Sequence, residues 1–137
     1  MHIIIVKFFS IFSIVFIFVL VSSIVMTQSA FANHLEITIR PTLGSTTSGC
    51  EDTVDGCYIP SIATVDVGST IIFLNTDITA HTFTAGTVRD GPSNEFDTGL
   101  LMTGDSFEYH PDTIGEIPYM CTIHPWMEGL IIVQNKI

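Results

Sequence analysis

Short segments rich in β-branched and aromatic residues run through the chain from residue 35 onward. The segments at 35–40 and 63–67 alternate apolar and polar residues with a period of two, which is typical of a strand with one buried face. Gly, Pro, Asn and Asp interrupt them at short intervals. We therefore predict an all-β sandwich of about seven strands. The expected strands lie at 35–40, 63–67, 70–74, 81–84, 106–109, 118–121 and 130–134. The polar stretch 89–94 is expected to form a turn.

The first 32 residues have a different character. Residues 3–26 are almost entirely apolar, with Lys7 as their only charged side chain, and the small-residue pattern Ala30-Phe31-Ala32 follows. This pattern predicts a secretory signal peptide over 1–32 and one domain over 33–137. The apolar run is longer than in most cleaved signals, and about 20 apolar residues span a bilayer, so an uncleaved hydrophobic anchor helix is the alternative. Either way we expect the domain in the periplasm, in the extracellular space or on the outer face of the cytoplasmic membrane.

The predicted domain is strongly acidic. All fourteen Asp and Glu residues lie after residue 32, against Arg40, Arg89 and Lys136, which gives this part of the chain a net charge of −11. Such a charge argues against binding to nucleic acid or to anionic lipid. It suits a basic protein partner, or it simply keeps an exported protein soluble. We expect a monomer that touches a membrane only through a possible N-terminal anchor.

The three cysteines fall into two groups. Cys50 and Cys57 bracket a polar, turn-forming segment, and we expect them to form a disulfide in an oxidising compartment. The rival interpretation, a second metal site or a redox pair, lacks both a C-x-x-C spacing and a nearby histidine. Cys121 is then left unpaired, and metal coordination would protect such a thiol from oxidation.

Near its end the chain carries the pattern Cys121-x-x-His124-x-x-Met127, and His81 lies far upstream. Each residue alone has an ordinary structural explanation, because Cys and Met often fill the core. Together they form a ligand set for copper: a thiolate and two imidazoles in a trigonal plane, with a weak axial thioether. The other histidines are expected to have surface or local structural roles: His2, His34 and His110.

Residues 77–83, 96–99 and 115–127 resemble the small blue-copper proteins, or cupredoxins, of the plastocyanin and amicyanin type. The short spacing between His124 and Met127 is similar to that of amicyanin. The resemblance implies a Greek-key β-sandwich that binds one mononuclear type 1 copper ion. It also implies the ligands: His81, Cys121 and His124 in the plane and Met127 on the axis.

The chain departs from the family pattern at two positions beside these ligands. Ile123 stands where many members have proline, and Thr82 stands where many have an asparagine that ties the two ligand loops together. A hydroxyl bridge from Thr82 to Thr122 would restore this tie.

The function implied by the resemblance is the transfer of single electrons between a protein donor and a protein acceptor outside the cytoplasm. Docking is expected near His124, Pro125 and Trp126, where the tryptophan either shields the metal or contacts the partner. Two alternatives use the same fold: a copper storage or delivery module, and a metal-free exported binding module. An enzyme is not expected, because a copper oxidase or a nitrite reductase needs a second copper site, for which the chain has neither the length nor the histidines.

Overall fold

Nine strands and one short 3-10 helix make up residues 35–136, the part of the chain that the structure, a computed structural model, describes. The predicted signal segment lies outside these residues. No helix within them is long and apolar enough to cross a membrane. The elements are β1 (Glu36–Pro41), the 3-10 helix (Cys50–Asp52), β2 (Tyr58–Ile59), β3 (Ile62–Asp66), β4 (Thr70–Leu74), β5 (Thr84–Thr87), β6 (Gly91–Asp97), β7 (Ser106–Tyr109), β8 (Gly115–Cys121) and β9 (His124–Gln134).

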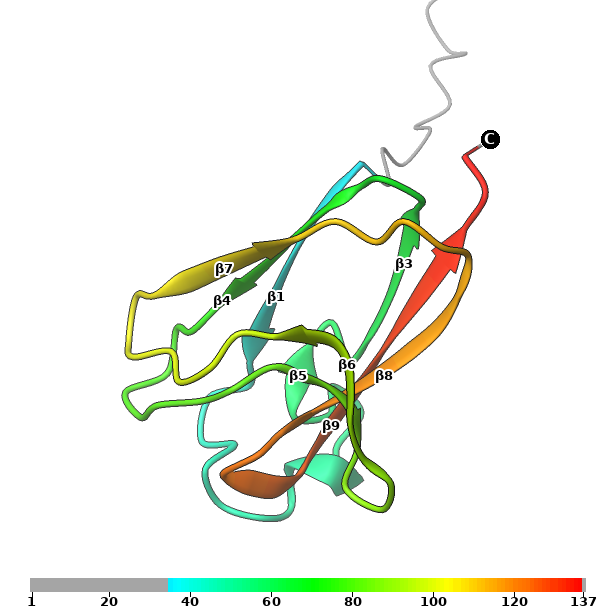
Figure 1. The fold of residues 1–137 in the computed structure, drawn as a ribbon. Helices are drawn as coiled ribbons and strands as arrows, with labels where there is room; N and C mark the ends of the chain where they lie inside the picture. Colours follow the sequence, from blue (N-terminus) through cyan, green and yellow to red (C-terminus); the bar gives the residue numbers. More distant parts are fainter. Residues whose placement is uncertain (1–34, 137) are drawn as a thin grey trace, which may run out of the picture. The chain divides into compact units, whose positions relative to one another are not determined.

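The strands form two sheets that face each other, as Figure 1 shows. One sheet has the order β2-β1-β4-β7 and the other the order β3-β9-β8-β5-β6. Both sheets are mixed, because β1 pairs with β4 and β3 pairs with β9 in parallel, whereas the other pairs are antiparallel. The prediction of an all-β sandwich is confirmed.

Most of the predicted strands form close to where the sequence placed them. In β4, for example, Ile71 and Phe73 are fully buried, whereas Thr70, Ile72 and Leu74 are half-buried. Alternating burial of this kind is what a strand with one face on the core requires. Two strands are longer than predicted, because β8 already begins at residue 115 and β9 at residue 124.

Two sequence predictions are wrong in detail. The strand expected at 81–84 begins only at Thr84, because the N–H groups of Thr82 and Phe83 bond to the sulfur of Cys121 and the hydroxyl of Thr98 instead of a neighbouring strand. The stretch expected as a turn at 89–94 contributes to β6. This strand lies at the sheet edge, where polar side chains remain solvated and a proline is tolerated.

The core between the sheets is built around five aromatic rings. Tyr58 packs against Phe83 and Tyr119 with ring centroids 5.0 and 4.9 Å apart, and Phe73 packs against Phe83 and Phe96 at 4.8 and 4.9 Å. Aromatic pairs at these separations contribute about 0.5–1.5 kcal/mol each beyond the area that they bury. The same cluster of buried residues includes Cys121 and Met127. Two of the four predicted metal ligands are therefore part of the hydrophobic core.

One glycine in β9, an inner strand of the larger sheet, is required by this packing. Gly129 pairs with Tyr119 across β8 and β9, and the tyrosine ring lies over the glycine so closely that a Cβ atom would overlap it. The ring is 1% exposed, so it has nowhere to move.

We expect Gly129→Ala to lower the free energy of unfolding by about 1–3 kcal/mol, the usual cost of overfilling a packed core. Chemical denaturation of the metal-free protein measures the change. The matched control is Glu128→Ala on the neighbouring exposed residue, which should stay within about 0.5 kcal/mol of the wild type. Equal stability of the two variants would contradict the packing argument.

Candidate metal centre

Two segments far apart in the sequence carry the side chains of the candidate site. His81 follows the loop after β4, and its backbone exchanges two hydrogen bonds with Leu101, of 3.1 and 2.8 Å, in an isolated bridge. Cys121 ends β8 and His124 begins β9, so only a two-residue turn separates them. The two residues are paired across the hairpin. The last strand was predicted only at 130–134, but β9 begins at His124, so His124 and Met127 both lie within it.

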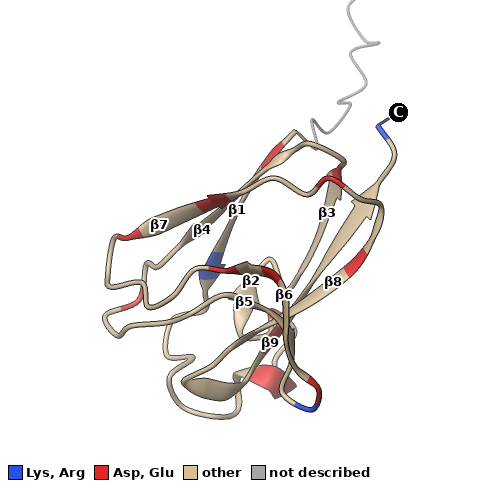
Figure 2. Cartoon of the chain, in the orientation of Figure 1, with Lys and Arg blue, Asp and Glu red and all other residues tan. Residues whose placement is uncertain are grey.

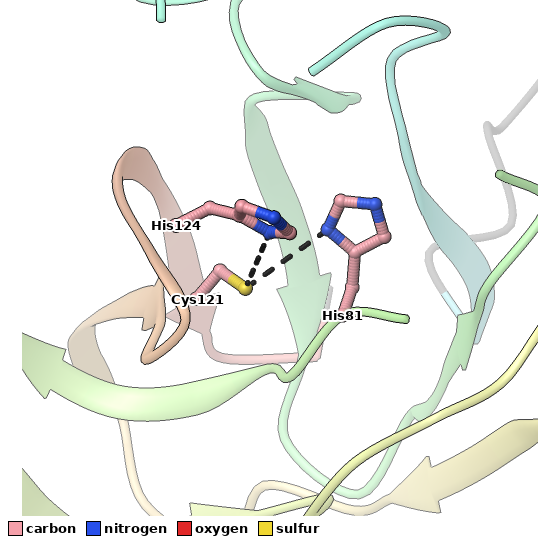
Figure 3. Close-up of side chains that lie close together, drawn as sticks. All are labelled: His81, Cys121 and His124. Atoms are coloured by element: carbon pink, nitrogen blue, oxygen red, sulfur yellow. Dashed lines mark hydrogen bonds between the residues drawn. The ribbon is translucent and has the colours of Figure 1, made fainter. Parts of the chain in front are cut away.

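The side chains of His81, Cys121 and His124 point toward one another, as Figure 3 shows. The sulfur of Cys121 lies 3.9 Å from Nδ1 of His81 and 3.5 Å from Nδ1 of His124. The three potential ligand atoms all lie within 4.8 Å of one another. One thiolate and two imidazole nitrogens facing a common point fit copper, which favours this mixture of soft and borderline donors. The donor set therefore fits a single type 1 copper site.

Local hydrogen bonds favour the ionised form of the thiol. Burial alone would raise the pKa of Cys121, but hydrogen bonds with His81 and with the backbone N–H of Thr82, 3.3 Å from the sulfur, outweigh it and lower the pKa to about 6. Burial likewise opposes the charge on His81, whereas hydrogen bonds with Cys121 and Asp77 raise its pKa. At neutral pH the sulfur is therefore mainly a thiolate, the form that binds metals.

The two ligand-bearing segments are tied together by threonines. The hydroxyl of Thr82 accepts the backbone N–H of Thr122 at 2.8 Å and lies 3.1 Å from the Thr122 hydroxyl. The expected hydroxyl bridge is therefore present. It holds the backbone next to His81 against the backbone next to Cys121, so the two ligands keep their relative positions without the family's asparagine.

Met127 is fully buried in β9, in the core cluster that contains Cys121. Its role as the axial ligand stays a prediction. Of the remaining histidines, His110 directly follows β7, with Nδ1 3.3 Å from the backbone oxygen of Ser69, and is not part of the cluster. His2 and His34 lie outside the described residues.

The segment between β1 and β2, residues 42–57, contacts Trp126 beside the site. We call this segment the disulfide loop. Cys50 and Cys57 form the expected disulfide, which removes them as candidates for a second metal site and leaves Cys121 as the free, buried cysteine. The loop contacts Trp126, whose indole N–H donates to the backbone oxygen of Ser45 at 2.8 Å. The Trp126 ring in turn packs against His124 with centroids 5.5 Å apart.

One residue beside the site, Asp77, is not part of the predicted ligand pattern. Its carboxylate oxygen Oδ2 lies 3.0 Å from Nε2 of His81, on the side of the ring opposite the sulfur. Burial would raise the pKa of this carboxyl group, but hydrogen bonds with His81 and with the N–H of Ile78 lower it. The position of Asp77 four residues before the predicted ligand His81 was the feature of the sequence that could have indicated this contact.

Removing the disulfide should destabilise the protein without removing the metal site. For so short a loop we expect the variant Cys50→Ala, Cys57→Ala to lose about 2–3 kcal/mol of unfolding free energy. The measurement is chemical denaturation with and without dithiothreitol. Reductant should bring the wild type to the stability of the variant and leave the variant unchanged. A wild type that does not respond to reductant would contradict this prediction.

Comparisons with solved structures identify proteins of the same architecture. The structure is similar to a purple cupredoxin from Nitrosopumilus maritimus, with a TM-score of 0.63 and 30% sequence identity over 71% of this chain and 98% of that one. It is also similar to a reduced amicyanin variant, with a TM-score of 0.54 and 18% identity over 73% of this chain and 83% of that one.

A third likeness is to an enzyme, the copper-containing nitrite reductase from Thermus scotoductus SA-01. The TM-score is 0.51 and the identity 22%, and the match covers 80% of this chain but only 30% of the enzyme. At this level of identity the similarities to amicyanin and to the reductase concern the fold alone. No protein-family model and no curated protein matches the chain.

Proposed function

The chain belongs to the cupredoxin family, and from this premise we propose that it is a type 1 copper protein that carries single electrons between redox proteins outside the cytoplasm. His81, Cys121 and His124 would hold the copper ion, and Met127 would supply the weaker fourth donor. Bound copper supplies a one-electron couple between Cu(I) and Cu(II). The observation that carries the proposal is the orientation of both Nδ1 atoms toward one buried sulfur.

The scaffold suits electron transfer because it restrains the ligands before any metal binds. Cys121 and His124 are held by the hairpin, His81 by its bridge to Leu101, and the two segments by Thr82. Ligands that move little between oxidation states keep the barrier to electron transfer low. A delivery module, by contrast, must release its metal, and thiolate or thioether clusters serve Cu(I) chaperones better than one thiolate with two imidazoles.

We propose that redox partners dock on the apolar surface around His124. Unlike His81, which is fully buried, His124 is half-buried, and Pro125 beside it is exposed. Further exposed apolar side chains lie on the segments that carry or flank the ligands: Ile78, Leu100, Met102 and Ile123. Trp126 is held by the disulfide loop and presents a rigid aromatic surface next to His124.

Acidic side chains are scattered over the strands and loops, as Figure 2 shows, so the net charge attracts a basic partner without fixing its orientation. The apolar surface then has to determine how the partner sits. Export, as the predicted signal segment implies, places this surface where other exported redox proteins can reach it.

We also propose that the protein is a carrier and not an enzyme. The likeness to the nitrite reductase extends to less than a third of that enzyme. In residues 35–136 the second group of potential ligands consists of Glu51 and two cysteines whose sulfurs are bonded to each other, so Glu51 alone remains as a potential ligand there. An assay of nitrite consumption by the copper-loaded protein tests this directly.

Loading the protein with Cu(II) should produce an intense visible colour from thiolate-to-copper charge transfer, and Cys121→Ser should abolish it. His110→Ala is the control, because this imidazole lies outside the cluster and its loss should leave the absorption unchanged. Absorption spectra and copper content measure both. A correctly folded wild-type protein that stays colourless with Cu(II) would refute the proposed function. A coloured protein that cannot be reduced and reoxidised would favour the delivery module.

Met127→Leu should keep the colour and raise the reduction potential, because loss of a weak axial donor disfavours Cu(II). Each tenfold change in the preference for Cu(I) corresponds to about 59 mV for a one-electron couple. Met120→Leu is the matched control: Met120 is buried next to Cys121 but lies outside the core cluster. Voltammetry that gives the same potential for both variants would show that Met127 is not a ligand.

A further inference from the structure

The two imidazoles of the site have different surroundings on the side away from the sulfur. The Nε2 atom of His81 lies 3.0 Å from Oδ2 of Asp77, and both side chains are buried, with 0% and 3% of their surface exposed. His124 is half-buried, and in residues 35–136 no side chain forms a hydrogen bond with its Nε2 atom. His81 is thus enclosed between a sulfur on one side and a carboxylate on the other.

The carboxylate of Asp77 is itself fixed in place. Its Oδ1 accepts the backbone N–H of Ile78 at 2.7 Å, and its Oδ2 accepts the hydroxyl of Thr79 at 3.2 Å. The backbone of Asp77 is held as well, since its N–H donates to Asn75 and its carbonyl oxygen accepts the hydroxyl of Thr103. The loop therefore presents one oriented negative charge to the His81 ring.

This arrangement decides which nitrogen of His81 carries the proton. A carboxylate can only accept a hydrogen bond, so the ring donates from Nε2. When the ring is neutral, as it must be to bind a metal, Nδ1 then presents its lone pair on the side of Cys121. A carboxylate in this position also makes the imidazole a stronger donor to a metal. His81 is in this way prepared to bind before the metal arrives.

The charge of Asp77 also acts on the oxidation state. With the Cys121 thiolate it places two negative charges beside a buried centre, which balance Cu(II) but exceed the charge of Cu(I). In an environment that is poorly solvated, this difference stabilises the oxidised ion relative to the reduced one.

We propose that Asp77 is a positioning residue of the copper site, which holds His81 as the Nε2-protonated tautomer and lowers the reduction potential by favouring Cu(II). The inference rests on the proposed function, because it concerns the same copper site. It adds a residue that the ligand pattern does not contain.

The test is Asp77→Asn, which keeps the shape of the side chain and an oxygen that can accept the Nε2 proton but removes the charge. We expect the variant to bind copper, to bind Cu(II) about tenfold more weakly and to have a reduction potential about 59 mV higher. Asp105→Asn is the matched control: it removes the same charge from a neighbouring loop, where the exposed carboxylate accepts the N–H of Met102 and contacts no ligand. Voltammetry and copper-competition titrations measure both.

A second readout follows the proton itself. In nuclear magnetic resonance spectra of the Cu(I)-loaded wild type, the Nε2-bound proton of His81 should be slow to exchange and shifted downfield, and Asp77→Asn should move it upfield. A second variant, Thr79→Val, should shift the reduction potential in the opposite direction. It removes the hydroxyl that the Asp77 carboxylate accepts, so the carboxylate attracts the Nε2 proton more strongly and the potential should fall below the wild-type value.

The possible results separate the two proposals. If the wild type binds copper and cycles, but Asp77→Asn shifts the potential no more than Asp105→Asn does, the inference about Asp77 is wrong and the proposed function stands. If the wild type itself does not bind copper, the proposed function fails. Should Asp77→Asn not fold, the potential of Thr79→Val decides, and a value at or above that of the wild type overturns the inference.

Discussion

The tight turn between β8 and β9 is the constraint on which the site depends. Because only Thr122 and Ile123 separate the two strands, Cys121 and His124 become a cross-strand pair, and the hairpin backbone sets the distance between sulfur and imidazole. The hairpin is central in its sheet, with β3 on one side and β5 on the other, so the turn cannot shift without breaking the sheet. His81 reaches the same point because Thr82 bonds to the turn. The pairing of the strands therefore determines where the proposed ligands lie. A change that disturbs the packing of the sheet would also disturb the geometry of the metal site.

Much of this arrangement could be predicted from the sequence, because the signals are local. The alternation of apolar and polar residues predicted β1 and β3, the run of β-branched and aromatic residues at 70–74 predicted β4, and the C-x-x-H-x-x-M spacing singled out three of the four proposed ligands. The disulfide between Cys50 and Cys57 also followed from short-range spacing and compartment. In each of these cases, neighbours in the sequence are neighbours in space.

The predictions that failed depend on contacts between distant segments. The polar residues of β6 have no strand pattern of their own, and they form a strand because β5 offers backbone partners at the sheet edge. The segment at 81–84 has strand-forming residues, but a sulfur and a hydroxyl take the hydrogen bonds that a strand would need. Asp77 was overlooked because an aspartate in a turn usually bonds to its own backbone, which it also does here through Ile78. Its second role exists only once the loop is folded against His81.

The unequal burial of the two imidazoles has a consequence for how electrons reach and leave the copper site. His81 is sealed inside, so under the proposed function electrons enter and leave through the His124 side. A donor and an acceptor that both dock on this surface exclude each other. The carrier must separate from the first partner before it meets the second, and its turnover is then limited by how fast these complexes come apart. Weak, short-lived complexes with each partner therefore allow faster turnover than tight complexes do.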